Sequence, residues 1–232
     1  MSQGVVLILF QVLVLVFAFC VHESAHAYTA MRLGDPTAYM LGRVTLNPLK
    51  HLDPFGSVLM PLIGLYYGGF IIGWAKPCPV TLRNFKNIRR DDILTSLAGP
   101  ASNLAMAIAA LLLLILFKHA VPGGRSAIGA AIYMAESSAG FDTSGLSTLF
   151  PVALLLYFGV IINLMLFVFN LFPIPPLDGS HVLRNFLPSG LDQAYARIGP
   201  WALLLFFFFG GRLIGIFYYP LINSFAHLLA IL

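Results

Sequence analysis

The segment His22-Glu23-Ser24-Ala25-His26 carries the residue types that a metal-dependent hydrolase requires. Residues four apart lie on one face of a helix, so both imidazoles can reach a single Zn²⁺ ion. Glu23 is displaced around the helix from that face and stays available as the base that activates water. The spacing therefore predicts a zinc site of the HExxH type. The alternative is a polar cluster that caps the cytoplasmic end of a membrane helix.

A catalytic zinc ion also needs a third protein ligand and one open position for water. Asp178 is the candidate, because three prolines end the preceding apolar helix and the chain then presents this carboxylate next to Gly179. An ordinary Asp-Gly turn at a membrane exit gives the same local pattern, so the spacing by itself leaves the role of Asp178 open.

Two asparagines in an apolar run are secondary candidates for the site. Asn163 and Asn170 lie seven residues apart and so share a helix face. A buried amide can donate a hydrogen bond to the developing oxyanion or to the substrate backbone. It can equally join two helices in a membrane, which is the simpler interpretation of Asn163.

The composition is that of an integral membrane protein. Of 232 residues, 59% are hydrophobic and only 9% are charged, whereas soluble domains carry roughly 25% charged residues. A soluble globule and a disordered chain are therefore excluded. The net charge of +4 comes from cations that flank apolar runs, which is typical of membrane anchoring and gives no support to a nucleic-acid partner.

Three apolar runs are long enough to cross about 30 Å of hydrocarbon. They are Val5–Val21, which continues in a helical pattern to about Met31, Ile93–Phe117 and Phe150–Phe172. The first run has no basic residue before it and is longer than the apolar region of a signal peptide, so we expect a retained helix. The apolar stretch Trp201–Leu232 is broken by glycines and a proline, and it forms either one long span with an interfacial tail or two short spans.

Basic residues predict how these runs are oriented, because cytoplasmic loops of membrane proteins are enriched in Lys and Arg. Basic clusters precede and follow Phe55–Trp74, so this segment, which contains glycines and a proline, is expected to enter and leave the membrane on one face. The N-terminus and the loop Lys118–Leu149 then lie outside. The helix that carries His22 and the helix that precedes Asp178 both end on the cytoplasmic side, where we expect the zinc site.

The motifs of this sequence resemble those of the site-2 protease family of intramembrane zinc metalloproteases. They occur in the family's order across residues 20–180 and comprise His22–His26, Gly42–Gly56, Gly73–Val80, Gly99–Asn103 and Asn170–Gly179. The chain looks most like the short form of the family, which lacks the PDZ domain and the pair of CBS domains that other members carry.

The resemblance implies one zinc ion per chain, bound by His22, His26 and Asp178. It implies that Glu23 activates water. It also implies that Asn170, which lies in a family motif, contacts the substrate or the oxyanion.

A second implication concerns Thr37–Asn47, in which residue types alternate as in a strand around a possible turn at Gly42. In family terms this segment resembles a membrane-associated strand pair beside the active site. An exposed strand edge there could bind an unwound substrate by strand addition.

Together these observations predict an all-α polytopic membrane protein, a transmembrane helix bundle with a small membrane-associated β-hairpin, in which residues 1–232 form a single domain. In the cell membrane it would hydrolyse peptide bonds within or near transmembrane segments of other proteins, such as membrane-tethered regulators or remnant signal peptides. A metal-ion or proton transporter is one alternative, because intramembrane His and carboxylate groups also line ion paths. A non-catalytic relative that binds membrane proteins is the other.

Overall fold

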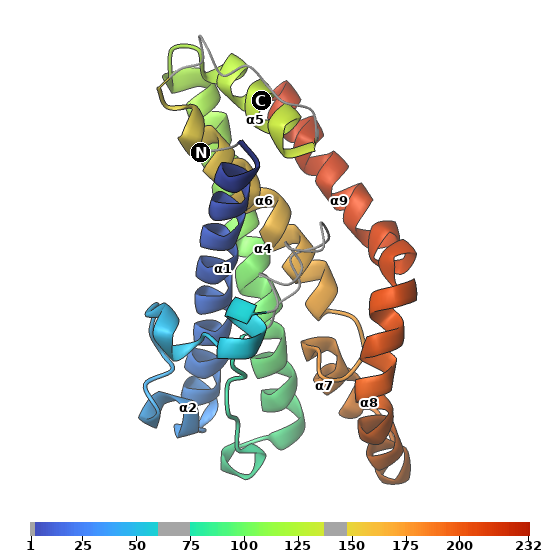
Figure 1. The fold of residues 1–232 in the computed structure, drawn as a ribbon. Coiled ribbons are helices and arrows are strands. Elements are labelled where there is room, and N and C mark those ends of the chain that lie inside the picture. The colour runs from blue at the N-terminus through green and yellow to red at the C-terminus, as the bar shows by residue number, and fades with distance from the viewer. Residues whose placement is uncertain (1–2, 60–74, 137–147) are drawn as a thin grey trace. The chain divides into compact units, whose positions relative to one another are not determined.

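The computed structural model describes residues 3–59, 75–136 and 148–232 (Figure 1). In this part of the chain the structure consists of helices and their connections, without a β-sheet. The helices are α1 (Gln3–Leu33), α2 (Thr37–Met40), α4 (Ile88–Ala120), α5 (Gly124–Glu136), α6 (Phe150–Asn170), α7 (Asp178–Arg184), α8 (Ser189–Phe209) and α9 (Gly211–Ile231), with short helical turns at Pro48–Lys50, Pro54–Leu59 and Leu82–Asn84.

Four of these helices are long and apolar enough to cross a membrane, namely α1, α4, α6 and α9. The three spans predicted from the sequence are thereby confirmed as helices of sufficient length. The C-terminal stretch is divided: α8 ends before Gly210 and α9 begins after it, so Trp201–Leu232 is not one continuous span. The protein is a multi-pass membrane protein.

The chain forms two compact units. The first consists of residues 1–15, 103–168 and 212–232, and the second consists of residues 16–102 and 169–211. Helices α1 and α4 each contribute one part to each unit.

The first unit is held together by an apolar core to which α4, α5, α6 and α9 contribute. Its fully buried side chains include Leu114, Leu154, Phe158 and Leu164. Helix α5 lies within Lys118–Leu149, the stretch predicted as an external loop, so part of that loop is helical. Its small buried residues allow it to pack closely on the core, as an amphipathic helix does.

The second unit contains the C-terminal part of α1, the first turns of α4, and helices α2, α7 and α8. The proline-rich loop between α6 and α7 is fixed by α8. Tyr195 of α8 donates a hydrogen bond from its hydroxyl to the carbonyl of Pro173 at 2.7 Å. A Cβ atom at Gly199 would lie 2.5 Å from Cβ of Pro175, so the glycine allows α8 to approach this loop closely. The loop that leads into α7 is therefore held on one side by α8.

The predicted β-hairpin at Thr37–Asn47 is wrong. The segment instead begins with helix α2, because the buried side chain of Asp35 accepts a hydrogen bond from the backbone N–H of Thr37 at 3.1 Å and starts a helical turn. Gly42 has φ +68 and ends that turn. The side chain of Arg43 is buried and donates to backbone carbonyls of other loops, so it does not alternate across a sheet. Local turn chemistry thus overrides a short polar–apolar alternation.

The ends of the segment predicted to re-enter the membrane lie together. Leu52 and Ala75 form an antiparallel bridge, and the N–H of Lys76 donates to the carbonyl of His51 at 2.7 Å. The path of Phe55–Trp74 itself lies mostly outside the described residues. The described residues on its two sides are in contact, as is expected for a segment that enters and leaves the membrane on one face.

Candidate metal centre

Helices α1 and α7 bring three side chains together within the second unit. Nε2 of His22 lies 3.0 Å from Nε2 of His26 and 3.1 Å from Oδ2 of Asp178. Nε2 of His26 lies 3.3 Å from Oδ1 of Asp178. Both histidines are buried, and Asp178 is mostly so. These are the three residues that the family resemblance implies as zinc ligands.

The spacing of these atoms fits one zinc ion. Nitrogen and oxygen ligands lie about 2.0–2.2 Å from zinc in tetrahedral sites, which places the ligand atoms roughly 3.3–3.6 Å from one another. The three separations of 3.0 to 3.3 Å are at or slightly below this range. In addition, Oδ2 of Asp178 is buried and has no hydrogen bond, an arrangement that is costly unless a cation supplies the missing contact.

Hydrogen bonding fixes which nitrogen of His26 faces this cluster. Nδ1 of His26 lies 2.7 Å from the carbonyl oxygen of Thr95, and a carbonyl can only accept, so Nδ1 carries the proton. In the neutral ring Nε2 then presents its lone pair to Nε2 of His22 and to the carboxylate of Asp178. A cation between Nε2 of His26, the carboxylate of Asp178 and an unprotonated Nε2 of His22 would satisfy all three groups at once. The donor set therefore suits a metal ion.

The charge of Asp178 also suits a ligand. Burial favours its neutral acid, but when the neighbouring imidazoles of His26 and His22 carry a proton, their positive charge and hydrogen bonds outweigh burial and hold the pKa of Asp178 well below its usual range. The residue is therefore a carboxylate, the form that binds metals.

Glycine at two positions makes the assembly possible. A Cβ atom at Gly99 of α4 would lie 2.3 Å from Nε2 of His26 and 2.6 Å from Nε2 of His22, so only glycine leaves room beside the ligand atoms. A Cβ atom at Gly179 would lie 2.2 Å from the carbonyl oxygen of Leu171. The glycine after Asp178 thus permits close packing of the start of α7 on the backbone that follows α6, rather than supplying flexibility.

The remaining predicted residues take different positions. Glu23 is partly buried in α1, and its carboxylate is not one of the three converging groups. Asn170 is the last residue of α6 and is partly buried. Asn163 lies in the first unit, where its Oδ1 accepts a hydrogen bond from Nδ2 of Asn103 at 2.9 Å and its Nδ2 donates to the carbonyl of Gly159 at 2.8 Å. These bonds are those of a residue that joins two helices.

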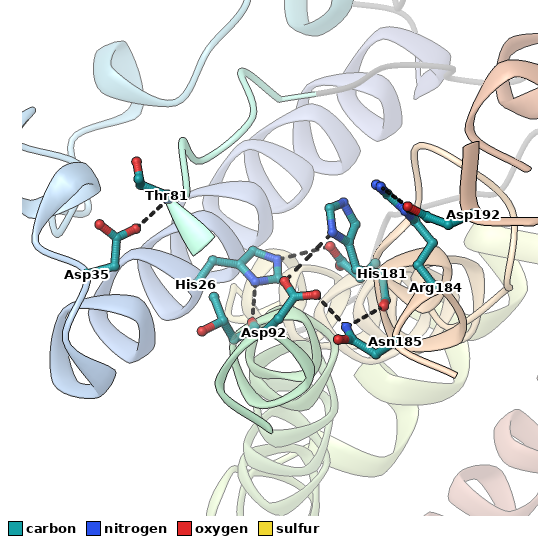
Figure 2. Close-up of polar contacts among 10 residues, drawn as sticks. His26, Asp35, Thr81, Asp92, His181, Arg184, Asn185 and Asp192 are labelled. Atoms are coloured by element: carbon teal, nitrogen blue, oxygen red, sulfur yellow. Dashed lines mark hydrogen bonds and ion pairs between the residues drawn. The ribbon is translucent and has the colours of Figure 1, made fainter. Parts of the chain in front are cut away.

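Three further residues support the cluster, although the sequence did not indicate them. Thr95 holds His26 through its backbone carbonyl. Asp92 and Asn185 link the first turns of α4 to α7 through their side chains (Figure 2). A contact made by a backbone carbonyl cannot be predicted from the type of residue at that position. A contact between two side chains 93 positions apart cannot be predicted from local spacing.

A buried carboxylate holds the loop that follows α1. Asp35 accepts hydrogen bonds from the N–H of Thr37 at 3.1 Å, from the N–H of Thr81 at 2.7 Å and from Nδ2 of Asn84 at 2.8 Å (Figure 2 shows the bond to Thr81). Burial favours the neutral acid, but these bonds, with that from the Thr37 hydroxyl, hold the pKa of Asp35 below its usual range. The loop is therefore anchored through an ionised side chain.

Comparisons with known proteins identify relatives of this chain. Residues 10–209 match the family described as Peptidase family M50. The chain is 40% identical over 195 residues to "Putative zinc metalloprotease YwhC" of Bacillus subtilis, which covers 84% of this chain and 77% of that protein. It is 31% identical over 191 residues to "Putative zinc metalloprotease Rip2" of Mycolicibacterium smegmatis, which covers 81% of this chain and 61% of that protein. No solved structure gives a significant match. The matched family region begins within α1 and includes α4, α6, α7 and α8, and so every helix that carries the cluster.

Proposed function

Because this chain belongs to peptidase family M50 and is a site-2 protease-like intramembrane zinc metalloprotease, we propose that His22, His26 and Asp178 hold its zinc ion and that Glu23 is its catalytic base. The observation that supports this ligand set is the convergence of three electron-pair donors from two helices at 3.0 to 3.3 Å. We propose a stoichiometry of one ion per chain.

Zinc, when bound, acts as a Lewis acid that polarises the scissile carbonyl and lowers the pKa of water towards ~7. Glu23 takes the proton from the attacking water at its carboxylate. The water oxygen forms a bond to the carbonyl carbon, the C–N bond breaks, and Glu23 passes the proton to the leaving nitrogen. Glu23 can do this because it is next to His22 in sequence but is displaced from the ligand face of α1.

Asn170 is proposed to donate a hydrogen bond to the substrate backbone or to the oxyanion. Its position at the end of α6, a few residues before Asp178, supports this role. Asn163 is the less favoured candidate for the same role, because its amide already bonds to Asn103 and Gly159.

The site is proposed to face the cytoplasm. The second unit, which holds the three ligands, also carries Arg32, Arg43 and Lys50 and the basic residues between positions 76 and 90. Loops rich in Lys and Arg stay on the cytoplasmic side of the membrane. We propose as substrates transmembrane segments of other proteins, such as membrane-tethered regulators or remnant signal peptides, which reach the site from the lipid bilayer.

The direct test uses the purified protein in detergent and a synthetic transmembrane peptide. The wild type should contain about one zinc ion per chain and cleave the peptide. Glu23→Gln should abolish cleavage and retain the zinc, because it removes the base but no ligand. A Glu23→Gln protein that still cleaves, or a wild type that conducts cations in liposomes and cleaves nothing, would contradict the proposal. The inactive variant can then be used to trap the natural substrate for mass spectrometry.

A further inference from the structure

Helix α7 is too short to fix its own position. It has seven residues, and isolated helices of that length are unstable in water. Its first residue is Asp178, so the place of this carboxylate depends on what the rest of α7 contacts.

One set of contacts joins α7 to α4. Asn185, at the C-terminal end of α7, donates from Nδ2 to Oδ2 of Asp92 and to the carbonyl of His181 at 2.9 Å. Nδ1 of His181 lies 3.9 Å from Oδ1 of the same Asp92 (Figure 2). Asp92 is only 7% exposed. Because a carboxylate this buried is costly without partners, it favours the position of α7 in which Asn185 donates a hydrogen bond to it.

The same turn of α4 also holds a histidine ligand. Asp92 and Thr95 are three residues apart and so lie within one turn of the helix. Thr95 accepts the hydrogen bond from Nδ1 of His26 at 2.7 Å, while Asp92 binds α7. One turn of α4 is thus in contact with the ring of His26 and with the helix that begins at Asp178, so it can set the distance between the two ligands.

We propose that Asp92 is a positioning residue for the metal site, which acts through Asn185 to hold Asp178 at coordination distance from the two histidines. The inference rests on the ligand set proposed above. Groups that orient metal ligands typically contribute 10–100-fold to metal affinity, and we expect an effect of that size here.

The test measures the zinc dissociation constant of the full-length protein in detergent by competition with a chelator. Asp92→Ala and Asn185→Ala should each weaken zinc binding by roughly 10–100-fold. The double variant should bind zinc no more weakly than the weaker single variant, because both changes remove the same contact. Asp92→Asn keeps one oxygen that can accept from Asn185, and its affinity should lie between those of the wild type and Asp92→Ala.

Arg184→Gln is the matched control, because it changes α7 on a different side. Arg184 forms a two-point ion pair with Asp192 of α8, with one of its two contacts at 3.2 Å. Loss of this pair should lower thermal stability while leaving zinc affinity unchanged within experimental error. If Arg184→Gln weakens zinc binding as much as Asp92→Ala does, the effect is general loosening of α7 and the proposal is overturned.

Asp178→Ala separates this inference from the proposed ligand set. If Asp178→Ala loses zinc while folded Asp92→Ala and Asn185→Ala bind it like the wild type, only the positioning role of Asp92 is overturned. If Asp178→Ala binds zinc normally, the ligand set itself is wrong. Circular dichroism in detergent establishes that each variant is folded, and Asn185→Ala, at a partly exposed helix end, keeps the test decisive if Asp92→Ala does not fold.

Discussion

The backbone of Gly99 lies directly against the imidazole of His26, so that a Cβ atom at position 99 would be only 2.3 Å from Nε2. The same Cβ atom would be 2.6 Å from Nε2 of His22. Side-chain carbons do not approach other atoms this closely, so either α4 or both rings would have to move. The bare backbone of one glycine therefore leaves the space in which the two histidine ligands converge.

Gly99→Ala should strongly reduce both the zinc content and peptide cleavage, because the added methyl group displaces the ligand atoms. This loss is expected although alanine is favoured over glycine by about 1 kcal/mol inside a helix. Metal analysis of the purified variant measures the effect. Gly129→Ala is the control, since a Cβ atom there meets nothing within 4 Å, and it should keep its zinc. Equal zinc content in the two variants would contradict the close approach.

Removal of zinc should lower the melting temperature of the wild type. A ligand that binds only the folded state stabilises it by about 2.7 kcal/mol when its free concentration is 100 times the dissociation constant. A chelator should therefore lower the melting temperature, and added zinc should restore it. Asp178→Ala should show neither shift, because the carboxylate that completes the ligand set is gone. If Asp178→Ala responds to the chelator as the wild type does, the zinc ion is bound elsewhere in the protein.

The two asparagines of α6 should differ in what their loss affects. Asn170→Ala should lower kcat by roughly 10²–10³-fold at unchanged zinc content, as loss of an oxyanion donor does. Asn163→Ala should act mainly on stability, by about 1 kcal/mol, because it removes the hydrogen bond between Asn163 and Asn103. Steady-state kinetics and thermal unfolding of both variants measure the difference. A wild-type kcat for Asn170→Ala would exclude the proposed contact with the reaction centre.

Acid should abolish the contribution of Asp35 to stability. Its pKa in the folded protein lies below the ordinary value of 3.8, so the unfolded chain binds the proton more readily. The stabilisation is therefore fully present above pH values near 4 and is lost as the pH falls through the folded-state pKa. The difference in stability between the wild type and Asp35→Asn should shrink over this range in acid unfolding experiments. A difference that grows towards low pH would reverse the assigned sign.

The sequence alone was sufficient for the parts of the site that depend on local periodicity. His22 and His26 had to share a face once α1 was helical, and the prolines before Asp178 predicted where the apolar helix would end. The sequence could not show that Gly179 packs on the carbonyl of Leu171, because close approach and turn flexibility both favour glycine.

The wrong prediction of a β-hairpin and the contacts that were not predicted have a common physical cause. The β-hairpin at Thr37–Asn47 was predicted from alternation, but the side chain of Asp35 starts a helical turn there, and the burial of Arg43 is decided by carbonyls far along the chain. Contacts made by a backbone carbonyl, as at Thr95, or by two side chains distant in sequence, as for Asp92 and Asn185, depend on the folded structure. They have no counterpart in local spacing.

X-ray absorption at the zinc edge of the purified, zinc-loaded protein distinguishes the proposed ligand set from any other zinc site. We expect a zinc ion with only nitrogen and oxygen neighbours at about 2.0–2.2 Å, including two imidazoles, and the loss of this spectrum in Asp178→Ala. A sulfur neighbour at about 2.3 Å, or an unchanged spectrum in Asp178→Ala, would show that His22, His26 and Asp178 are not the ligand set.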